Sequence, residues 1–203
     1  MKKNTVLFSR GRIRPLLFAE PLSGADDALL LKQMKGRVFD PSLVSAIARR
    51  CSKGFPAVIQ CTPLKGATPF PTSFWLTCPW LVRLCGKRES EGAIGILEEA
   101  LKRDRSSWTE FHCHAARLRI LSLPAAQRRF LRRYRSRTWR SLAHGGVGGI
   151  EYLRCGGGGV KCLHLQVASW LALGAHPAGD ILERLLSPLE CGASSRRGCV
   201  YSS

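Results

Sequence analysis

The residue with the most distinctive chemical setting is Cys78, which follows Thr77 and precedes Pro79. Proline suits the first position of a helix, where its missing N–H costs no hydrogen bond, so this order predicts a helix that begins directly after Cys78. A thiol at that point lies near the unpaired N–H groups of the first turn, which favour a thiolate. Cys78 is therefore a candidate nucleophile, redox thiol or metal ligand.

The cysteine count also bears on chemistry, because nine is a high and odd number for 203 residues. In a chain of this size without an export signal, such cysteines favour free thiols, metal ligands or catalytic groups over a disulfide framework. The sequence contains no CxxC pair and no HExxH motif. A metal site would therefore have to be assembled from distant segments.

A second distinctive stretch lies between Phe111 and Ile150, where there are nine arginines and no acidic residue. Guanidinium groups bind phosphate oxygens, and aromatic rings stack on unpaired bases. The stretch predicts a surface for nucleic acid or the ribosome, formed by Arg128, Arg129, Arg132, Arg133, Arg137, Arg140 and Trp139. The alternative is a solvated face whose long side chains cover the edge of the core, with Trp139 buried beneath.

The elements that position these residues are expected to be mostly helical. The apolar periodicity predicts helices over residues 28–34, 80–88, 91–103, 125–142, 160–173 and 177–187, and another from about 106. A helix is also expected after Asp40-Pro41, because Val44, Ile47 and Cys51 recur at helical spacing. Residues 57–61 and 73–76 are expected to pair as a β-hairpin around a proline-rich loop. On the helix over 125–142, the expected apolar stripe is Phe130, Leu131, Tyr134 and Leu142.

Composition limits the partners and the location more than the fold. Lys and Arg outnumber Asp and Glu by 32 to 14, and the resulting net charge of +18 predicts attraction to polyanions. The length suits one mostly helical α+β domain with a small β-hairpin over 25–187, between a basic arm over 1–24 and a tail over 188–203. No apolar run is long enough to span a membrane or to form a secretory signal, so a cytoplasmic location is expected. The sequence gives no indication of the oligomeric state.

Three motifs, taken in order, resemble a known family. They are Arg50-Cys-Ser-Lys-Gly-Phe-Pro56, then Thr68-Pro-Phe-Pro-Thr72 with Trp75-Leu-Thr-Cys-Pro79, and finally Val160-Lys-Cys-Leu-His164. Together they are similar to the bacterial family catalogued as domain of unknown function 501, which has no activity to carry over. The resemblance implies a cytoplasmic bacterial protein in which Cys51, Cys78, Cys162 and His164 hold motif positions. Family members often carry further histidines after the last motif, where this chain has Gln166 and Ser169.

The four motif positions form a candidate metal site. The thiolates of Cys51, Cys78 and Cys162 with the imidazole of His164 make a tetrahedral zinc set, and thiolates also hold iron–sulfur clusters. Residues two apart on a helix point about 200° apart, so Cys162 and His164 can share an ion only if the helix begins at about residue 163. The alternative is that Cys51 and Cys162 are small core residues.

The same residues also allow chemistry without a metal. Cys78 with His164 as its base would be an activated nucleophile or a redox thiol, although the sequence leaves their separation open. The leading functional hypothesis is thus a Cys/His cluster that binds zinc or an iron–sulfur cluster, or that supports thiol chemistry. The alternative is a non-enzymatic protein that binds nucleic acid or the ribosome, so the sequence does not decide whether this is an enzyme.

Overall fold

The structure, a computed structural model, describes residues 19–152, 158–192 and 199. In those residues it has eight α-helices and two small antiparallel sheets, which confirms the predicted mostly helical α+β fold. Most of the predicted N-terminal arm, and residues 193–198 and 200–203 of the predicted tail, lie outside the described residues. The helices are α1 (Gly24–Gln33), α2 (Pro79–Ser90), α3 (Ala93–Arg103), α4 (Arg105–Ser122), α5 (Ala125–Tyr134), α6 (Ser136–His144), α7 (Leu163–Leu173) and α8 (Gly179–Leu186). The strands are β1 (Val44–Arg50), β2 (Pro56–Cys61), β3 (Leu64–Lys65), β4 (Thr68–Pro69) and β5 (Phe74–Leu76), with 3₁₀ turns η1 (Pro41–Leu43) and η2 (Val147–Gly149).

The main sheet has the strand order β1-β2-β5, with both pairs antiparallel. The predicted hairpin is present as β2 and β5, in which Val58 lies opposite Leu76 and Ile59 opposite Trp75. The central strand β2 is buried along its whole length, because it has a partner strand on each side and packed side chains on both faces. The proline-rich loop between β2 and β5 contains the short β3–β4 pair.

The first strand of this sheet corrects one prediction. The Asp40 cap and Pro41 do begin a helical segment, but it is only the single 3₁₀ turn η1, and the residues after it form β1 instead of a helix. Register shifts interrupt the pairing of β1 with β2, so Ala46, Ile47 and Ala48 are buried consecutively. A strand with such bulges loses its alternation, and its apolar spacing then imitates that of a helix.

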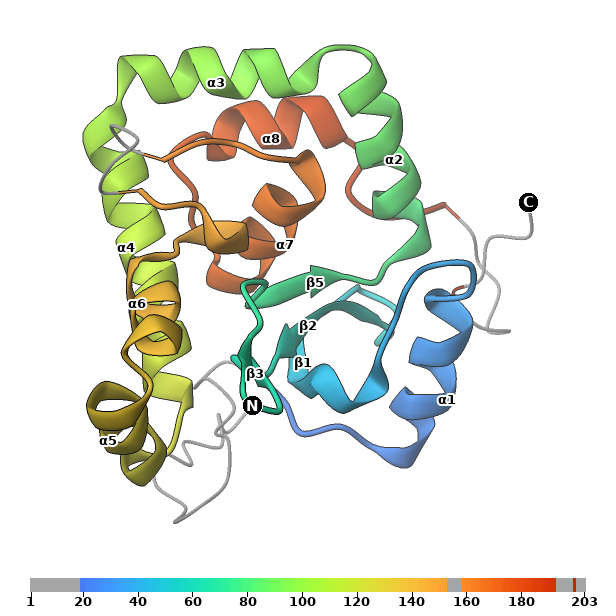
Figure 1. Cartoon of the computed structure of the whole chain (residues 1–203). Coiled ribbons are helices and arrows are strands. Elements are labelled where there is room, and N and C mark those ends of the chain that lie inside the picture. Colours follow the sequence, from blue (N-terminus) through green and yellow to red (C-terminus); the bar gives the residue numbers. More distant parts are fainter. Residues whose placement is uncertain (1–18, 153–157, 193–198, 200–203) are drawn as a thin grey trace.

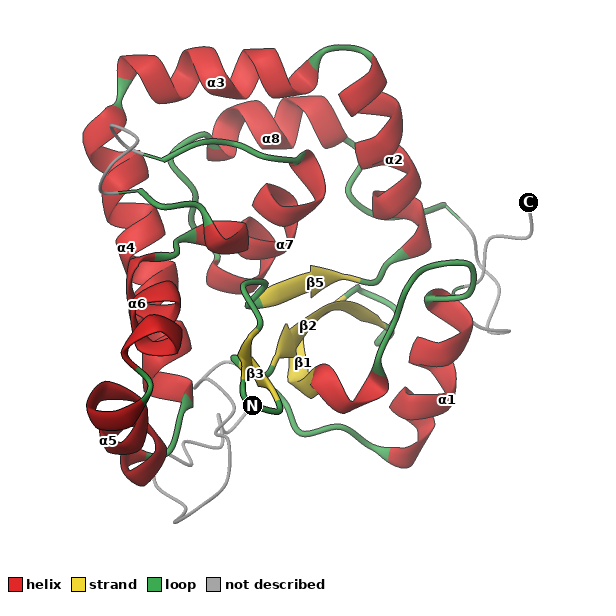
Figure 2. Cartoon of the chain, in the orientation of Figure 1, coloured by secondary structure: helices red, strands yellow, loops and turns green. Residues whose placement is uncertain are grey.

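Helices cover both faces of the sheet, as Figures 1 and 2 show. On one face α1 contributes Leu30 to a cluster with Ile47, Ile59 and Cys61. On the other face α7 is the central element of a larger cluster that includes Val58 from the sheet and residues of α2, α3 and α8. No helix among the described residues is long and apolar enough to cross a membrane. Helix α7 packs against β5 on one side and against α2 on the other (Figure 1).

The predicted helix over 125–142 is two helices. Arg135 lies between α5 and α6 with φ −135° and ψ 56°, outside the helical region. Leu131 and Leu142 are buried as predicted, but Phe130 and Tyr134 remain 50% and 64% exposed. Because the chain changes direction at Arg135, the apolar stripe expected from a continuous helix does not form, and two aromatic side chains face solvent.

Candidate metal centre and arginine-rich surface

Helices α2 and α7 bring together three side chains of metal-ligating type. Glu89 lies near the C-terminal end of α2, whereas Cys162 and His164 flank the first residue of α7. Helix α7 begins at Leu163, so Cys162 is its extended N-cap residue with φ −154° and ψ 155°. This confirms the condition predicted for Cys162 and His164 to share an ion, because Cys162 precedes the helix and does not follow its 100° rotation.

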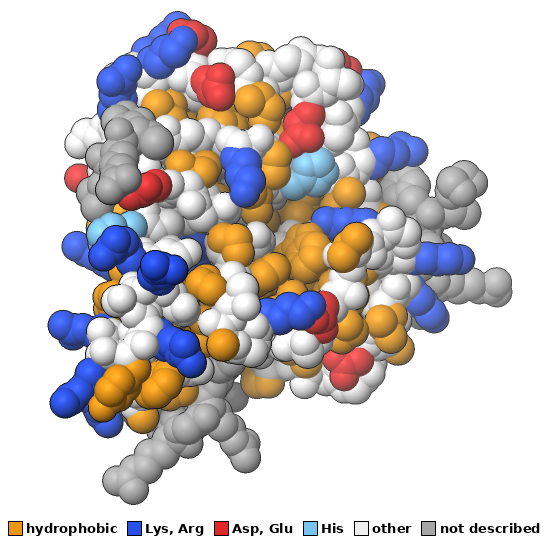
Figure 3. Space-filling model, in the orientation of Figure 1, with side chains coloured by type: hydrophobic (Ala, Val, Ile, Leu, Met, Phe, Trp, Pro, Cys, Tyr) orange, Lys and Arg blue, Asp and Glu red, His pale blue; other side chains and the backbone are white. Residues whose placement is uncertain are grey.

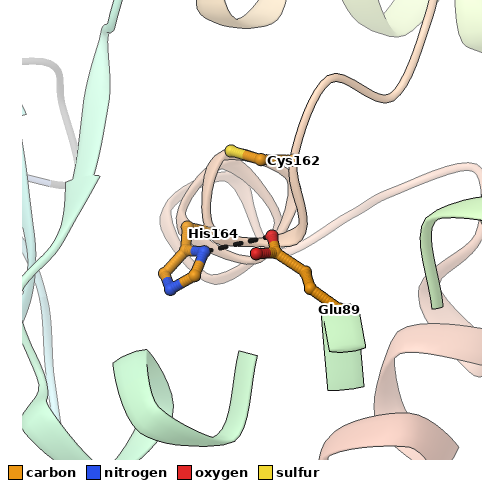
Figure 4. A group of neighbouring side chains, drawn as sticks. All are labelled: Glu89, Cys162 and His164. Carbon is orange, nitrogen blue, oxygen red and sulfur yellow. Dashed lines mark hydrogen bonds and ion pairs between the residues drawn. The ribbon is translucent and has the colours of Figure 1, made fainter. Parts of the chain in front are cut away.

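The ligand atoms of Glu89, Cys162 and His164 all lie within 4.8 Å of one another. Figure 4 shows the Glu89 carboxylate and the His164 ring pointing toward each other, with Nδ1 and Oε1 3.1 Å apart. The same Oε1 accepts a hydrogen bond of 2.6 Å from the backbone N–H of Leu163. Glu89 thus caps α7, where the helix dipole also favours a negative charge.

The second ring nitrogen of His164 fixes the ring against α2. Nε2 lies 3.1 Å from the carbonyl oxygen of Val82, which can only accept a hydrogen bond. With Nε2 as the donor, a neutral ring directs the lone pair of Nδ1 at a carboxylate oxygen. Two acceptors at that distance repel unless a proton or a metal ion lies between them.

The thiol of Cys162 completes the group from the N-cap of α7. Its pKa is raised by burial and by the negative charge of Glu89, although the N–H groups of the first turn act in the opposite direction. A divalent cation at this point would reverse the effect, because it stabilises the thiolate. A cation here would offset the negative charges of Cys162 and Glu89 when both are ionised.

The other two predicted ligands lie elsewhere. Among the described residues, neither Cys51 nor Cys78 belongs to a group of three or more candidate ligand atoms. Cys51 follows β1 in a turn and packs at the edge of the main cluster. Cys78 is the N-cap residue of α2, as predicted, but its thiol is buried against that of Cys199.

The predicted thiolate at Cys78 is not favoured by its surroundings. A hydrogen bond with Cys199 and burial raise the pKa of Cys78, and they outweigh the backbone N–H groups of Leu81 and Trp80, which lower it. The two ring nitrogens of His164 lie against Glu89 and Val82 instead of Cys78. The N–H groups at the start of α2 do lower the pKa of Cys78, as predicted, but their effect is smaller than that of Cys199 and burial.

The arginine-rich surface is on α5 and α6, at the opposite end of the molecule from α2 (Figure 1). Figure 3 shows Lys and Arg side chains gathered over these helices, with hydrophobic side chains between them. The predicted arginines are exposed except Arg128, which is half-buried, and Trp139 is half-buried too. The guanidinium group of Arg132 lies over the Trp139 ring at 5.6 Å, and that of Arg133 lies over Tyr134 at 5.6 Å.

Sequence reasoning missed the roles of two residues, Glu89 at the candidate metal centre and Arg119 on α4. Glu89 was not singled out from the sequence, and only its contact with α7 distinguishes it. Arg119 was counted with the basic stretch, yet it is 2% exposed and donates to the carbonyls of Pro71, Gly145 and Gly146. The available signal for Arg119 was its helical spacing from Phe111, Ala115 and Ser122, which are buried on the same face of α4.

The fold and the three-residue group define a mostly helical α+β protein with a candidate metal centre at a contact between two helices. Within this class, the chain belongs to the family described as Protein of unknown function (DUF501), whose model matches residues 47–184. The family resemblance predicted from three motifs is thereby confirmed, and the match includes Glu89, Cys162, His164 and the arginine-rich surface. No curated protein and no solved structure matches the chain significantly.

Proposed function

We propose that the protein binds one divalent transition-metal ion, with zinc as the first candidate, through Glu89, Cys162 and His164. The observation that carries the proposal is that the ligand atoms of Glu89, Cys162 and His164 all lie within 4.8 Å of one another, with Nδ1 of His164 3.1 Å from Oε1 of Glu89. Ligands of a tetrahedral zinc ion lie about 3.3–3.7 Å from one another, given bond lengths of about 2.0–2.3 Å. Small side-chain rotations would bring Cys162 to that separation.

The surroundings of His164 support the same proposal. A histidine that binds zinc usually donates its other ring N–H to a carbonyl or a carboxylate, which fixes the tautomer. The Val82 carbonyl supplies such an acceptor for Nε2. A set with a single thiolate from the predicted cluster favours zinc over an iron–sulfur cluster, which needs mostly thiolate ligands. The eight described cysteines are free thiols, which fits the reducing conditions of a cytoplasm.

The test is zinc affinity, measured by competition with a chromophoric chelator under reducing conditions. The wild-type protein should bind close to one equivalent, and His164→Gln should weaken binding by roughly tenfold or more. His114→Gln is the matched control, because His114 is exposed on α4 and belongs to no candidate ligand group in the described residues. Equal affinity in His164→Gln and wild type would reject the site.

The same assay separates this set from the one predicted by sequence. Cys78→Ser and Cys51→Ser should leave zinc affinity unchanged if Glu89, Cys162 and His164 are the ligands. A loss of zinc in both variants would instead support the four-residue set of Cys51, Cys78, Cys162 and His164, which would require a rearrangement around the N-terminus of α2.

A second candidate function is the binding of nucleic acid, free or in the ribosome, by the arginine-rich surface. The observation that favours it is the exposure of Phe130 and Tyr134 among arginines that form no ion pair within the described residues. Exposed aromatic rings provide stacking platforms for unpaired bases, and arginines without carboxylate partners remain available for phosphates. A pocket of about 340 Å³ beside Trp139 is lined by Arg128, Arg129 and Arg132.

Fluorescence anisotropy with a labelled single-stranded RNA tests this second function. Affinity should fall steeply with salt, because each phosphate contact releases counterions. The pair Arg132→Glu with Arg133→Glu should reduce the salt dependence and weaken binding by more than tenfold. The pair Lys32→Glu with Lys35→Glu makes the same charge change at exposed positions in the last turn of α1 and just after it, and serves as the control. Equal losses in the two pairs would indicate a general charge effect and reject the surface as the site.

A further inference from the structure

The face of α2 that contacts His164 contains another potential ligand. Val82, Cys85 and Glu89 are spaced i, i+3 and i+7, so they lie along one side of the helix. The intervening residues Arg83, Gly86 and Lys87 are exposed, which shows that this side is the one directed at the interior. His164 contacts both Val82 and Glu89, at the two ends of this row.

Cys85 lies between these two contact points. The carbonyl of residue i in a helix points toward the N–H of residue i+4, so the Val82 oxygen is at the level of residues 85 and 86. The His164 ring, hydrogen-bonded to that oxygen, therefore contacts α2 at about the level of Cys85 along the helix axis. The Cys85 side chain is 0% exposed and packs in the cluster that contains Leu163, the residue between Cys162 and His164.

We propose that Cys85 is the fourth ligand of the metal centre, which then consists of Cys85, Glu89, Cys162 and His164. This inference rests on the proposed function, because it concerns the same site. As the side chains stand, the sulfur of Cys85 forms no group within 4.8 Å with any two of the other ligand atoms. Ligation thus requires rotation about its one side-chain torsion to another staggered position.

The electrostatics of Cys85 agree with this placement. Burial, with a smaller contribution from the negative charges of Glu89 and Cys162, raises the pKa of its thiol to about 12. Both groups are therefore close enough to act on Cys85. A buried thiol that faces two anionic groups is unfavourable as a thiolate without a cation and favourable with one.

Four protein ligands have a consequence for what the site does. A closed tetrahedral set of two thiolates, a carboxylate and an imidazole leaves no position for a substrate or a water molecule, which is the pattern of structural zinc sites. The ion would fasten α7, which begins after the glycine-rich residues 156–159, to α2. The proposed role is thus to fix the start of the central helix of the core.

Cobalt substitution counts the thiolates directly. Cobalt(II) added anaerobically to metal-free protein should give a thiolate-to-cobalt absorption in the near ultraviolet with the intensity of two sulfur ligands. Cys85→Ser should lose about half of this intensity, and Cys162→Ser should lose a similar share. Cys61→Ser removes a buried thiol from the other face of the sheet, so it should leave the absorption unchanged.

The outcomes separate the two proposals. Full absorption in Cys85→Ser would overturn the fourth ligand while the site of three ligands stands, and no such absorption in the wild type would overturn both. If Cys85→Ser does not fold, X-ray absorption of the zinc-loaded wild type provides the count. Two sulfur neighbours at about 2.3 Å support the proposal, and a single one contradicts it.

Discussion

Arg119 shows how a single side chain joins distant segments. Its guanidinium group donates to the carbonyls of Pro71, Gly145 and Gly146 at 2.6–2.7 Å, and it has no carboxylate partner among the described residues. Burial lowers the pKa of Arg119 to about 10, so the group stays charged at neutral pH. Carbonyl dipoles from two loops thus replace a counter-ion, and the arginine fastens the proline-rich loop to the glycine-rich one.

Replacement of this arginine is expected to be costly even when the charge is kept. Arg119→Lys should lower the free energy of unfolding by about 2–4 kcal/mol, because an ammonium group cannot reach three separated carbonyls and leaves some of them buried without a donor. Arg137→Lys, at an exposed position of α6, should change it by less than about 0.5 kcal/mol. Urea denaturation of both variants measures the difference, and similar midpoints would contradict the account.

At this scale, the sequence predicted the candidate site in part. Cys162 and His164 could be paired by a spacing argument, because both belong to one short segment and depend only on where a helix begins. Glu89 and Arg119 could not, since their roles depend on partners 74 and 26 residues away. Cys78 was assigned from its local position alone, and its contact with Cys199 in the tail reversed the expected effect on its pKa.

Among the elements, the loop that contains η2 is shaped by a close approach to α4. The Val147 N–H donates to Nδ1 of His112, a fully buried side chain of α4, at 3.0 Å. A Cβ atom on Gly146 would lie 2.3 Å from the same nitrogen. The glycine at position 146 thus reflects close contact with a buried histidine.

A methyl group at this point should therefore disrupt the packing. Gly146→Ala should lower the free energy of unfolding by about 2 kcal/mol or more, because the backbone or His112 has to move. Gly95→Ala, in the middle of α3 with open space around its Cβ position, should instead raise it by about 0.5–1 kcal/mol. Thermal unfolding of the two variants shows opposite shifts if this is correct, and a neutral Gly146→Ala would contradict it.

The predictions of the fold were best where one local signal acted alone. Pro79 set the start of α2, and the strand-forming residues in 57–61 and 73–76, on either side of a turn-rich loop, identified β2 and β5. The predictions failed at β1 and at Arg135, where bulged pairing with β2 and a change of direction between two short helices depend on the rest of the chain. Periodicity does not distinguish such a strand from a helix, because a bulge breaks the period of two and can leave apolar residues three or four positions apart, as in a helix.

For the whole molecule, a buried histidine, His112, and a half-buried one, His176, connect stability to pH. Burial lowers the pKa of His112 to about 4, and burial together with the nearby His112 lowers the pKa of His176 to about 3. Nδ1 of His176 accepts from the Ala178 N–H, and Nε2 donates to Gln166, so the neutral ring is the form that fits. In the unfolded chain both rings titrate near their ordinary pKa of about 6.5.

Stability should consequently decline as the pH falls below about 6.5. In this range the unfolded state binds more protons than the folded state, and each histidine contributes a slope of up to about 1.4 kcal/mol per pH unit. His176→Gln should reduce the slope by the share of one histidine, whereas His114→Gln on the surface should leave it unchanged. Urea denaturation at pH 7, 6 and 5 measures these slopes, and a constant free energy of unfolding would contradict the prediction.

The candidate metal centre, between α2 and α7, and the arginine-rich surface, on α5 and α6, lie on different helices (Figure 1), so each can be altered without the other. The most direct test of the central claim is anomalous X-ray diffraction at the zinc edge from crystals of the zinc-loaded protein. A single strong peak about 2.0–2.3 Å from Cys162 Sγ, a His164 ring nitrogen and a Glu89 oxygen is the predicted result. A zinc peak at Cys51 or Cys78, with none between α2 and α7, would contradict the account.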